Sequence, residues 1–516
     1  MRSVLRSWAH GPLFIVPLVA VLILVGYGVQ PASPAPVQPA RVVISSDRDI
    51  SNVDPAAISA PADYTVAYLV YSALVRLKPG TRELEPDLAE KWDVSADGLV
   101  YTFHLRRGVK WQNNLGEVTA EDIIAHFQRV ASKDSGSLFF VDLEPVSKIE
   151  APDRYTVRFT MRQPYPAFMT AVIAYRPGLI VPKRIIDSNA ASLKTNPVGS
   201  GPYVFASWRQ GAEVVLRANP SYYAGPPAVG EVVMKIVRED ETALLALQRG
   251  EVDARYVQVP EVQKQIQGIK ELRVLTAPMP RTYYIALNTS RPPFNDVRVR
   301  RALWYGLNRK SIVERVFNSR GTVADTVLPP VVEGHYARRV YTYDPSKAKQ
   351  LLKEAGFQEG SDRTLSIMTV GLRDLSDIAA VAQDNWRALG VTVRVEIVDT
   401  PVLLQRARAG NYDMMSWAQL RTEPEQFLVS FFHSSNINAT NFSRYDKIDR
   451  LLDGFRTSTD RKERLRLIEE AQLQLQQDAP HIPVLNPTLM LAHNPRIQGA
   501  KLGLLIFNVW EWSLAK

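Results

Sequence analysis

The chain has 516 residues, which is too long for a single hydrophobic core, so two or three domains are expected. Its 46% hydrophobic and 22% charged residues are typical of a folded globular protein, and its net charge of +9 is spread along the chain without a basic run, which disfavours nucleic-acid binding. The absence of cysteine excludes disulfides, thiolate metal sites and cysteine nucleophiles.

The N-terminal sequence indicates export. Arg2 and Arg6 precede an apolar run of 18 residues at 12–29. A basic start followed by an apolar run is typical of a secretory signal peptide, and this run is also just long enough to span a membrane. We therefore expect residues 1–30 to be a signal peptide or an N-terminal membrane anchor, residues 31–40 to be a Pro/Ala-rich spacer, and the folded body to be periplasmic.

The first elements of the folded body are strands and a helix. A strand is expected at Arg41, where the folded part begins. Residues 88–111 combine a turn with alternating apolar side chains, which indicates a β-hairpin. A helix follows, with Thr119 as its N-cap and Asp122 three residues later, the spacing of a capping box.

The stretch 196–211, NPVGSGPYVFASWRQG, places glycines on both sides of Ser200. A phosphate loop would need a Lys-Ser/Thr pair and a following helix, and a nucleophile elbow would need the spacing G-x-S-x-G. Neither pattern is present, and the alternation after Pro202 indicates a strand. We expect a tight turn that uses the tolerance of glycine for positive φ.

The second half predicts an α/β domain. A helix is expected in 343–357, with Asp344 as its N-cap and Gly356 at its end. Strand, helix and strand follow at 364–371, 374–390 and 391–399, which predicts a β-α-β unit with parallel pairing. Two further helices and a strand are expected at 447–455, 460–476 and 481–495.

The sequence contains no recognisable catalytic or metal-binding motif. It has no H-E-x-x-H, no Walker lysine loop and no dinucleotide fingerprint. His104 and His126 are expected to be solvated or hydrogen-bonded, and His433 has no second histidine at ligand spacing. We expect a binding protein rather than an enzyme, with no catalytic residue, metal or cofactor.

Sequence blocks spread over most of the chain resemble one family. The blocks, in chain order, are LAEKWDVSADGLVYTFHLRRGVKW with EVTAEDIIAHFQRV, NPVGSGPYVFASW, VVLRANPSYY, PPFNDVRVRRALWYGLNR, YDPSKAKQLLKEAGF and YDMMSWAQL. Together they are similar to the family 5 extracellular solute-binding proteins, the peptide/nickel/opine group that serves ABC importers. The resemblance runs from about Val42 to the end of the chain.

The resemblance implies an α/β fold with two lobes, that of a type II periplasmic binding protein, with an extra domain inserted in the N-terminal lobe. Ligand would lie in the cleft between the lobes, which closes around it. The implied boundaries are 41–70, 196–278 and 491–516 for lobe I, 71–195 for the inserted domain, and 279–490 for lobe II.

The block SWAQLRTEPEQFL implies the ligand-contacting segment. In peptide-binding members a tryptophan packs against the ligand and an aspartate three residues later holds the α-amino group; here these positions are Trp417 and Leu420. A buried ammonium without a carboxylate would be costly, so leucine in place of the aspartate argues against a peptide ligand held by its free α-amino group. Arg421 either favours an anionic group or points to solvent. Gln419 could offer a further polar group.

Other candidates lie around this segment. Glu425 could supply the missing negative charge, and Glu423 is expected to be tied to its loop. Tyr284 and Asn288 are weaker cleft candidates, since core packing explains Tyr284 equally well. Two tryptophans on apolar helix faces are expected in the core, Trp304 and Trp386.

The function implied is that of a monomeric substrate-binding subunit of an ABC importer. It would capture an oligopeptide or peptide-like solute and deliver it to an ABC permease in the cytoplasmic membrane. Two alternatives stay open: a binding protein for an anionic small solute, such as an opine or sugar conjugate, and a membrane-anchored solute sensor.

Overall fold

The structure is a computed structural model, and it describes residues 40–58, 60–79, 81–257, 260–357, 364–503 and 508–515. The predicted signal peptide or anchor at 1–30 and nearly all of the predicted spacer lie outside these residues. Within the described ranges, no helix combines the length and the apolar character that crossing a membrane requires.

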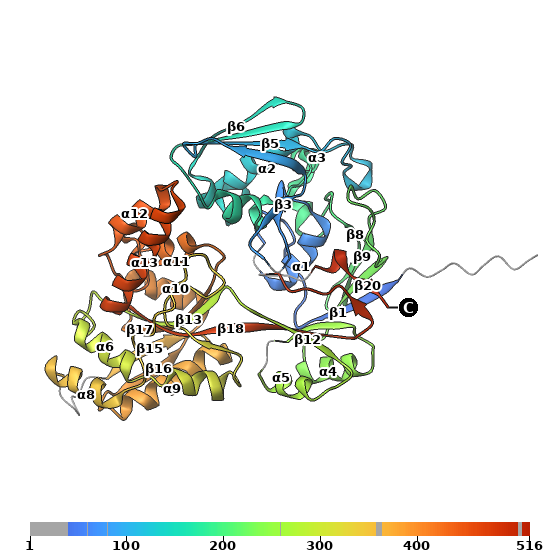
Figure 1. The fold of residues 1–516 in the computed structure, drawn as a ribbon. Coiled ribbons are helices and arrows are strands. Elements are labelled where there is room, and N and C mark those ends of the chain that lie inside the picture. The colour runs from blue at the N-terminus through green and yellow to red at the C-terminus, as the bar shows by residue number, and fades with distance from the viewer. Residues whose placement is uncertain are drawn as a thin grey trace, which may run out of the picture. The chain divides into compact units, whose positions relative to one another are not determined.

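A large mixed sheet contains strands from both halves of the chain. Its order is β16-β15-β17-β13-β18-β11-β1-β10-β9-β8, and β12 and β14 also pair with β18. β18 (His481–His493) pairs with β13 near its start and with β11 and β12 near its end (Figure 1). The other strands of this sheet are β1 (Arg41–Ser46), β8 (Tyr203–Arg209), β9 (Glu213–Ala218), β10 (Glu231–Ile236), β11 (Ala254–Val257), β12 (Arg273–Pro278), β13 (Arg281–Leu287), β14 (Gly321–Val323), β15 (Leu365–Thr369), β16 (Val393–Ile397) and β17 (Met414–Leu420).

The predicted β-α-β unit is confirmed. β15 and β16 pair in parallel, and α9 (Arg373–Arg387) connects them. The preceding helix, α8 (Pro345–Glu354), begins where the Asp344 carboxylate accepts a hydrogen bond from the backbone N–H of Lys347 at 2.8 Å. Gly356 follows it with φ of +73°, the left-handed conformation that glycine adopts readily.

A second, four-stranded antiparallel sheet contains the predicted hairpin. Its order is β4-β5-β7-β6, and α2 (Ala120–Ala131) packs against it. The predicted capping box of Thr119 and Asp122 is present at the start of α2. The strands are β4 (Ala89–Val94), β5 (Val100–Leu105), β6 (Val146–Asp153) and β7 (Thr156–Met161).

The remaining helices cover these sheets or connect their strands. The two helices predicted near 447–455 and 460–476 are α12 (Asp449–Thr457) and α13 (Arg461–Asp478). Two short strands, β2 (Val75–Leu77) and β3 (Leu84–Pro86), form a separate hairpin. The other elements are α1 (Pro61–Val70), α3 (Lys183–Asn189), α4 (Asp240–Gln248), α5 (Pro260–Gln267), α6 (Val297–Tyr305), α7 (Arg309–Ser311), α10 (Thr400–Ala409), α11 (Pro424–Phe432), β19 (Ile497–Gln498) and β20 (Ser513–Leu514).

Separate hydrophobic cores lie on the two parts of the large sheet. One is built mainly from residues before 235 and the C-terminal segment, and another from residues between 283 and 485. Trp304 and Trp386 are fully buried in the second core, which confirms the prediction that they are core residues. The lobe boundaries implied by the family resemblance stay predictions.

The two glycines around Ser200 have a different role from the one predicted. A turn followed by β8 is present, but neither Gly199 nor Gly201 has positive φ. Instead, a Cβ on Gly199 would lie 2.2 Å from the carbonyl oxygen of Val70, and one on Gly201 would lie 2.7 Å from the same atom. Only glycine allows the chain to pass this close to the end of α1.

Candidate functional site

A cavity of about 80 Å³ opens beside the C-terminal end of α1. We call it the aromatic cavity, because four tyrosines and a tryptophan line it: Tyr68, Tyr71, Tyr175, Tyr222 and Trp510. Since one water needs about 10–15 Å³ of such space, the cavity has room for several waters or for one side chain of a ligand.

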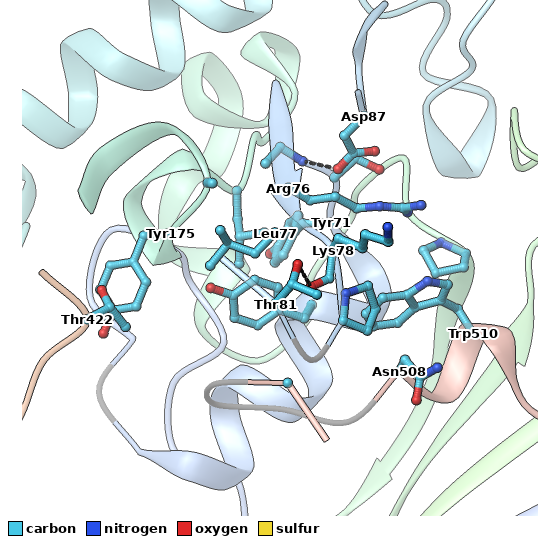
Figure 2. A pocket seen from close by; sticks show the side chains of 18 of the residues that line it. Tyr71, Arg76, Leu77, Lys78, Thr81, Asp87, Tyr175, Thr422, Asn508 and Trp510 are labelled. Atoms are coloured by element: carbon cyan, nitrogen blue, oxygen red, sulfur yellow. Dashed lines mark hydrogen bonds between the residues drawn. The ribbon is translucent and has the colours of Figure 1, made fainter. Parts of the chain in front are cut away.

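The wall of the aromatic cavity comes from segments far apart in the sequence. Tyr71 follows the end of α1 in an extended conformation, and β2 and the loop after it supply Leu77, Lys78 and Thr81. Figure 2 shows Tyr175 and Thr422 together at one end, with Asn508 and Trp510 at the other. Thr422 comes from the second half of the chain, so both halves contribute to one cavity.

Several polar atoms of the lining are available to a ligand. Ser72 Oγ, Thr422 Oγ1 and Trp510 Nε1 are buried and have no hydrogen-bond partner among the residues that the structure describes. Buried polar groups are nearly always hydrogen-bonded in folded proteins. A solute with donors and acceptors would satisfy these three atoms.

The polar groups at the β2 side of the cavity are already paired. Arg76 Nε donates to Glu85 at 2.6 Å, and the backbone N–H of Ala73 donates to Asp87 at 2.9 Å. Burial raises the pKa of Asp87, and the positive charge of Arg76 opposes this rise. Arg76 and Asp87, each held by its own hydrogen bond, form a fixed wall of the cavity.

Arg82 holds Thr422 in place. Its guanidinium donates to the carbonyl oxygen of Thr422 at 2.7 Å and to the Glu423 carboxylate at 2.7 Å. Burial raises the pKa of Glu423, and Arg82 opposes this rise. Glu423 is therefore held by an ion pair, but not within its own loop as predicted: its partner Arg82 comes from the β2–β3 hairpin.

The sequence of residues 83–439, more than half of the chain, matches the family described as "Bacterial extracellular solute-binding proteins, family 5 Middle". The chain belongs to this family. Among curated relatives, this family 5 protein is 30% identical to the di/tripeptide-binding protein 2 of Pseudomonas aeruginosa, over 90% of this chain and 93% of the relative.

Solved structures agree with the family assignment. HbpA2 from Haemophilus parasuis superposes with a TM-score of 0.84 at 28% identity, over 92% of this chain and all of that chain. The periplasmic binding protein DppA from Helicobacter pylori, in complex with the peptide STSA, superposes with a TM-score of 0.79 at 28% identity, over 92% and 98% of the two chains. The family 5 protein therefore has the predicted type II periplasmic binding fold.

The segment predicted to contact ligand lies at the end of β17, next to the aromatic cavity. Trp417 is half-buried and packs against the second core, and Gln419 is buried with no side-chain partner among the described residues. Leu420 pairs with Arg281 of β13, and its carbonyl oxygen accepts a hydrogen bond from the Arg421 guanidinium at 3.0 Å. None of these four lines the cavity, but Thr422, two residues beyond Leu420, does.

Tyr284 and Asn288 have structural roles instead. Tyr284 is 1% exposed and stacks on His481 with ring centroids 4.4 Å apart. Asn288 follows the opposite end of β13 from Arg281, roughly 20 Å along the strand, and its amide donates to the carbonyl oxygens of Gly410 and Tyr412. The geometry does not bring either residue to the aromatic cavity, because one packs in the core and the other fixes a loop.

Glu425 lies in a separate groove of about 570 Å³. Its carboxylate forms an ion pair with Arg456 at 3.0 Å. Burial raises its pKa to about 7, and Arg456 opposes the rise. Since Glu425 already has a cationic partner, it is poorly suited to replace the aspartate that is missing at Leu420.

Sequence reasoning missed the residues of the N-terminal half. Tyr64 and Tyr68 are four residues apart in α1 and Tyr71 follows the helix directly, and this spacing was a visible signal of an aromatic cluster. Tyr175 and Trp510 gave no such signal, because only the fold brings them to α1. His126 is buried and hydrogen-bonded, as predicted, and its partner is Pro177 O at 2.8 Å. Within the described ranges, no group of three or more His, Cys, Asp or Glu side chains could hold a metal ion.

Proposed function

We propose that this family 5 protein is a non-enzymatic, substrate-binding subunit of an ABC importer that acts in the periplasm. It captures an oligopeptide or a peptide-like solute and delivers it to a permease in the cytoplasmic membrane. It acts as a monomer, and the N-terminal segment serves export.

The observation that carries the proposal is the composition of the aromatic cavity. Aromatic walls with a few unpaired polar atoms suit the side chains and amides of a peptide. Thr422 lies two residues beyond Leu420, in the block that the family resemblance implies for ligand contact, and this proximity supports the proposal. The printed names of two relatives, a di/tripeptide-binding protein and a protein in complex with a peptide, support the same ligand class.

The experiment that tests the proposal is mass spectrometry of small molecules that copurify with the exported protein. The protein is purified gently and its ligands are released by denaturation. Short peptides, absent from a parallel preparation of an unrelated exported protein, are expected. A single non-peptide compound would contradict the peptide assignment, and turnover of the retained solute by the protein would contradict the non-enzymatic role.

The same preparation distinguishes a soluble subunit from an anchored sensor. Loss of residues 1–30 removes the anchor and supports the importer subunit. Intact mass of the exported protein measures this directly. A mass that includes these residues would favour the sensor.

A further inference from the structure

Three arginines without carboxylate partners adjoin residues at or near the lining of the aromatic cavity: Arg176 follows Tyr175, Arg421 precedes Thr422, and Arg281 pairs with Leu420. Arg176, Arg281 and Arg421 are each half-buried, and within the described ranges none has a carboxylate oxygen within 4 Å. Buried arginines are normally paired or hydrogen-bonded. Each guanidinium donates to a neutral oxygen, that of the Tyr175 hydroxyl, the Tyr283 hydroxyl or the Leu420 carbonyl respectively, and has further N–H groups for an acceptor that a solute would bring.

Arg176 joins this group to the aromatic cavity. Its guanidinium lies 4.6 Å from the ring centroid of Tyr175 and 5.2 Å from that of Tyr64, and Tyr175 lines the cavity. Arg176 Nε is buried and has no hydrogen-bond partner in the described part of the chain. Stacking on aromatic rings and a hydrogen bond from its Nη2 to the Tyr175 hydroxyl hold the charge in place, and its Nε–H stays available to a solute.

Arg281 and Arg421 come from the facing half of the chain. Arg281 pairs with Leu420 across β13 and β17, and the backbone N–H of Arg421 donates to Pro280 O at 3.0 Å, so the two arginines are neighbours. Arg281 Nε is also buried without a partner among the described residues. The guanidinium of Arg421 lies 5.9 Å from the ring centroid of Phe431.

The arginines from the two halves affect the pKa values of the same side chains. Arg176 and Arg421 both lower the pKa of Asp142 against the burial that raises it to about 6. Arg176 and Arg281 both oppose the rise in the pKa of Tyr64 that burial causes. Asp142 forms no ion pair in the described ranges, and Asp374 also lies near this group, because its carboxylate accepts a hydrogen bond from the hydroxyl of Tyr283 at 2.9 Å and the Arg281 guanidinium donates to the same hydroxyl at 3.4 Å.

We propose that Arg176, Arg281 and Arg421 together bind a carboxylate of the solute, so that the protein selects anionic peptide-like ligands. The inference rests on the proposed function and adds the charge of the substrate. A guanidinium binds a carboxylate through parallel N–H···O bonds, which favours this anion over a neutral amide.

The test compares free-acid and amidated tripeptide libraries made without Asp and Glu. Calorimetric titration of the ligand-stripped protein is expected to show at least about tenfold tighter binding of the free acids. Arg281→Gln and Arg421→Gln should each weaken binding of the free acids by about tenfold to hundredfold and leave binding of the amides unchanged. The exposed Arg249→Gln is the matched control and should change neither affinity. Thermal unfolding of each ligand-free variant checks that it is folded.

Further libraries distinguish the source of the carboxylate. If amidated peptides bind only when they contain Asp or Glu, the arginines accept a side-chain carboxylate, which also supports the inference. Equal affinity of neutral amides and free acids would overturn the inference and leave the proposed function standing. Loss of binding on N-acetylation but not on amidation would overturn it in favour of an ammonium site at Asp142. Failure of every library to bind would contradict both proposals.

Discussion

At the scale of single residues, the buried hydroxyl of Thr422 is a proposed contact for the solute. The residue is 1% exposed, it lines the aromatic cavity, and its Oγ1 has no partner in the described part of the protein. An unsatisfied buried hydroxyl costs free energy in the empty protein. Bound solute that contacts the hydroxyl would remove this cost, so residues of this kind couple stability to binding.

Thr422→Val tests this role, because valine keeps the shape and removes the hydroxyl. The free energy of unfolding of the empty protein should stay unchanged or rise by up to about 1 kcal/mol. Affinity for the retained solute should fall by about fivefold to tenfold, as measured by calorimetric titration. The exposed Thr195→Val is the control. Unchanged affinity in Thr422→Val would show that the hydroxyl does not contact solute.

The raised pKa of Glu425 predicts that the stability of the protein depends on pH. Burial raises its pKa from 4.5 to about 7, so the folded state binds this proton more tightly than the unfolded chain does. Its stabilising contribution is complete below pH 4.5 and is lost as pH rises through about 7. The loss is up to about 3 kcal/mol.

Urea unfolding at pH 5 and pH 8 measures this loss. The free energy of unfolding of the wild type should fall more between these pH values than that of Glu425→Gln, since the variant has no proton to release. The exposed Glu251→Gln should behave as the wild type. Parallel behaviour of wild type and Glu425→Gln would contradict the role of burial.

At the scale of elements, the end of α1 positions the aromatic cavity. The chain at Gly199 and Gly201 packs on the carbonyl oxygen of Val70, and Tyr71 and Ser72 follow directly. The backbone N–H of Gly201 donates to Val70 O at 2.9 Å. This close approach fixes where α1 ends and therefore where the cavity begins.

Gly199→Ala should destabilise the protein by about 3 kcal/mol or more, because its Cβ would meet backbone atoms that cannot rotate away. Gly371→Ala is the control, since its Cβ would come no closer than 3.9 Å to a neighbour and its φ is not positive. It should change the free energy of unfolding by less than about 1 kcal/mol. Equal effects of the two substitutions in urea unfolding would contradict the packing argument.

Elements with local signals could be predicted, and elements that depend on distant residues could not. Asp344 and Gly356 define α8 by capping, and the alternation after Pro202 defines β8. The need for glycine at position 199 could not be predicted from the sequence, because it arises from a contact with Val70, more than a hundred residues earlier. The cavity was missed for the same reason: Tyr68, Thr422 and Trp510 meet only in the folded chain.

The family resemblance pointed to the segment from Trp417 to Arg421, which lies next to the aromatic cavity, and weaker sequence arguments pointed to Tyr284 and Asn288, which do not line it. Alternation along a strand says which residues share a face, and it does not say which end of the strand lies near the site. Asn288 lies beyond the end of β13 opposite to Arg281, and Tyr284 packs in the core. Thr422 escaped notice because nothing in its local sequence distinguishes it from a loop threonine.

At the scale of the whole molecule, Arg82 connects the β2–β3 hairpin to the start of α11. Its ion pair with Glu423 joins residues 341 positions apart. Glu423 is 6% exposed in its side chain and Arg82 is 28% exposed. Loss of the arginine would leave a buried carboxylate without its partner, which is more costly than loss of an exposed pair.

Arg82→Ala should lower the free energy of unfolding by about 2 kcal/mol at neutral pH, less than for a fully buried pair because Arg82 is partly exposed. Adding Glu423→Gln should restore part of this loss. Arg461→Ala, which removes an arginine that is 70% exposed, is the control and should cost less than about 1 kcal/mol. Equal losses in Arg82→Ala and Arg461→Ala, measured by urea unfolding, would contradict the importance of this connection.

Photoaffinity labelling tests the central claim most directly, because it identifies both the kind of solute and the place where it binds. A tripeptide library with a photoreactive side chain is bound to the stripped protein, irradiated and mapped by peptide sequencing. The account predicts labels in residues 68–81 and 420–423, beside Trp510, and their loss when unlabelled tripeptides compete. Labels confined to other segments, or labels that competitor does not reduce, would contradict a peptide-binding site at the aromatic cavity.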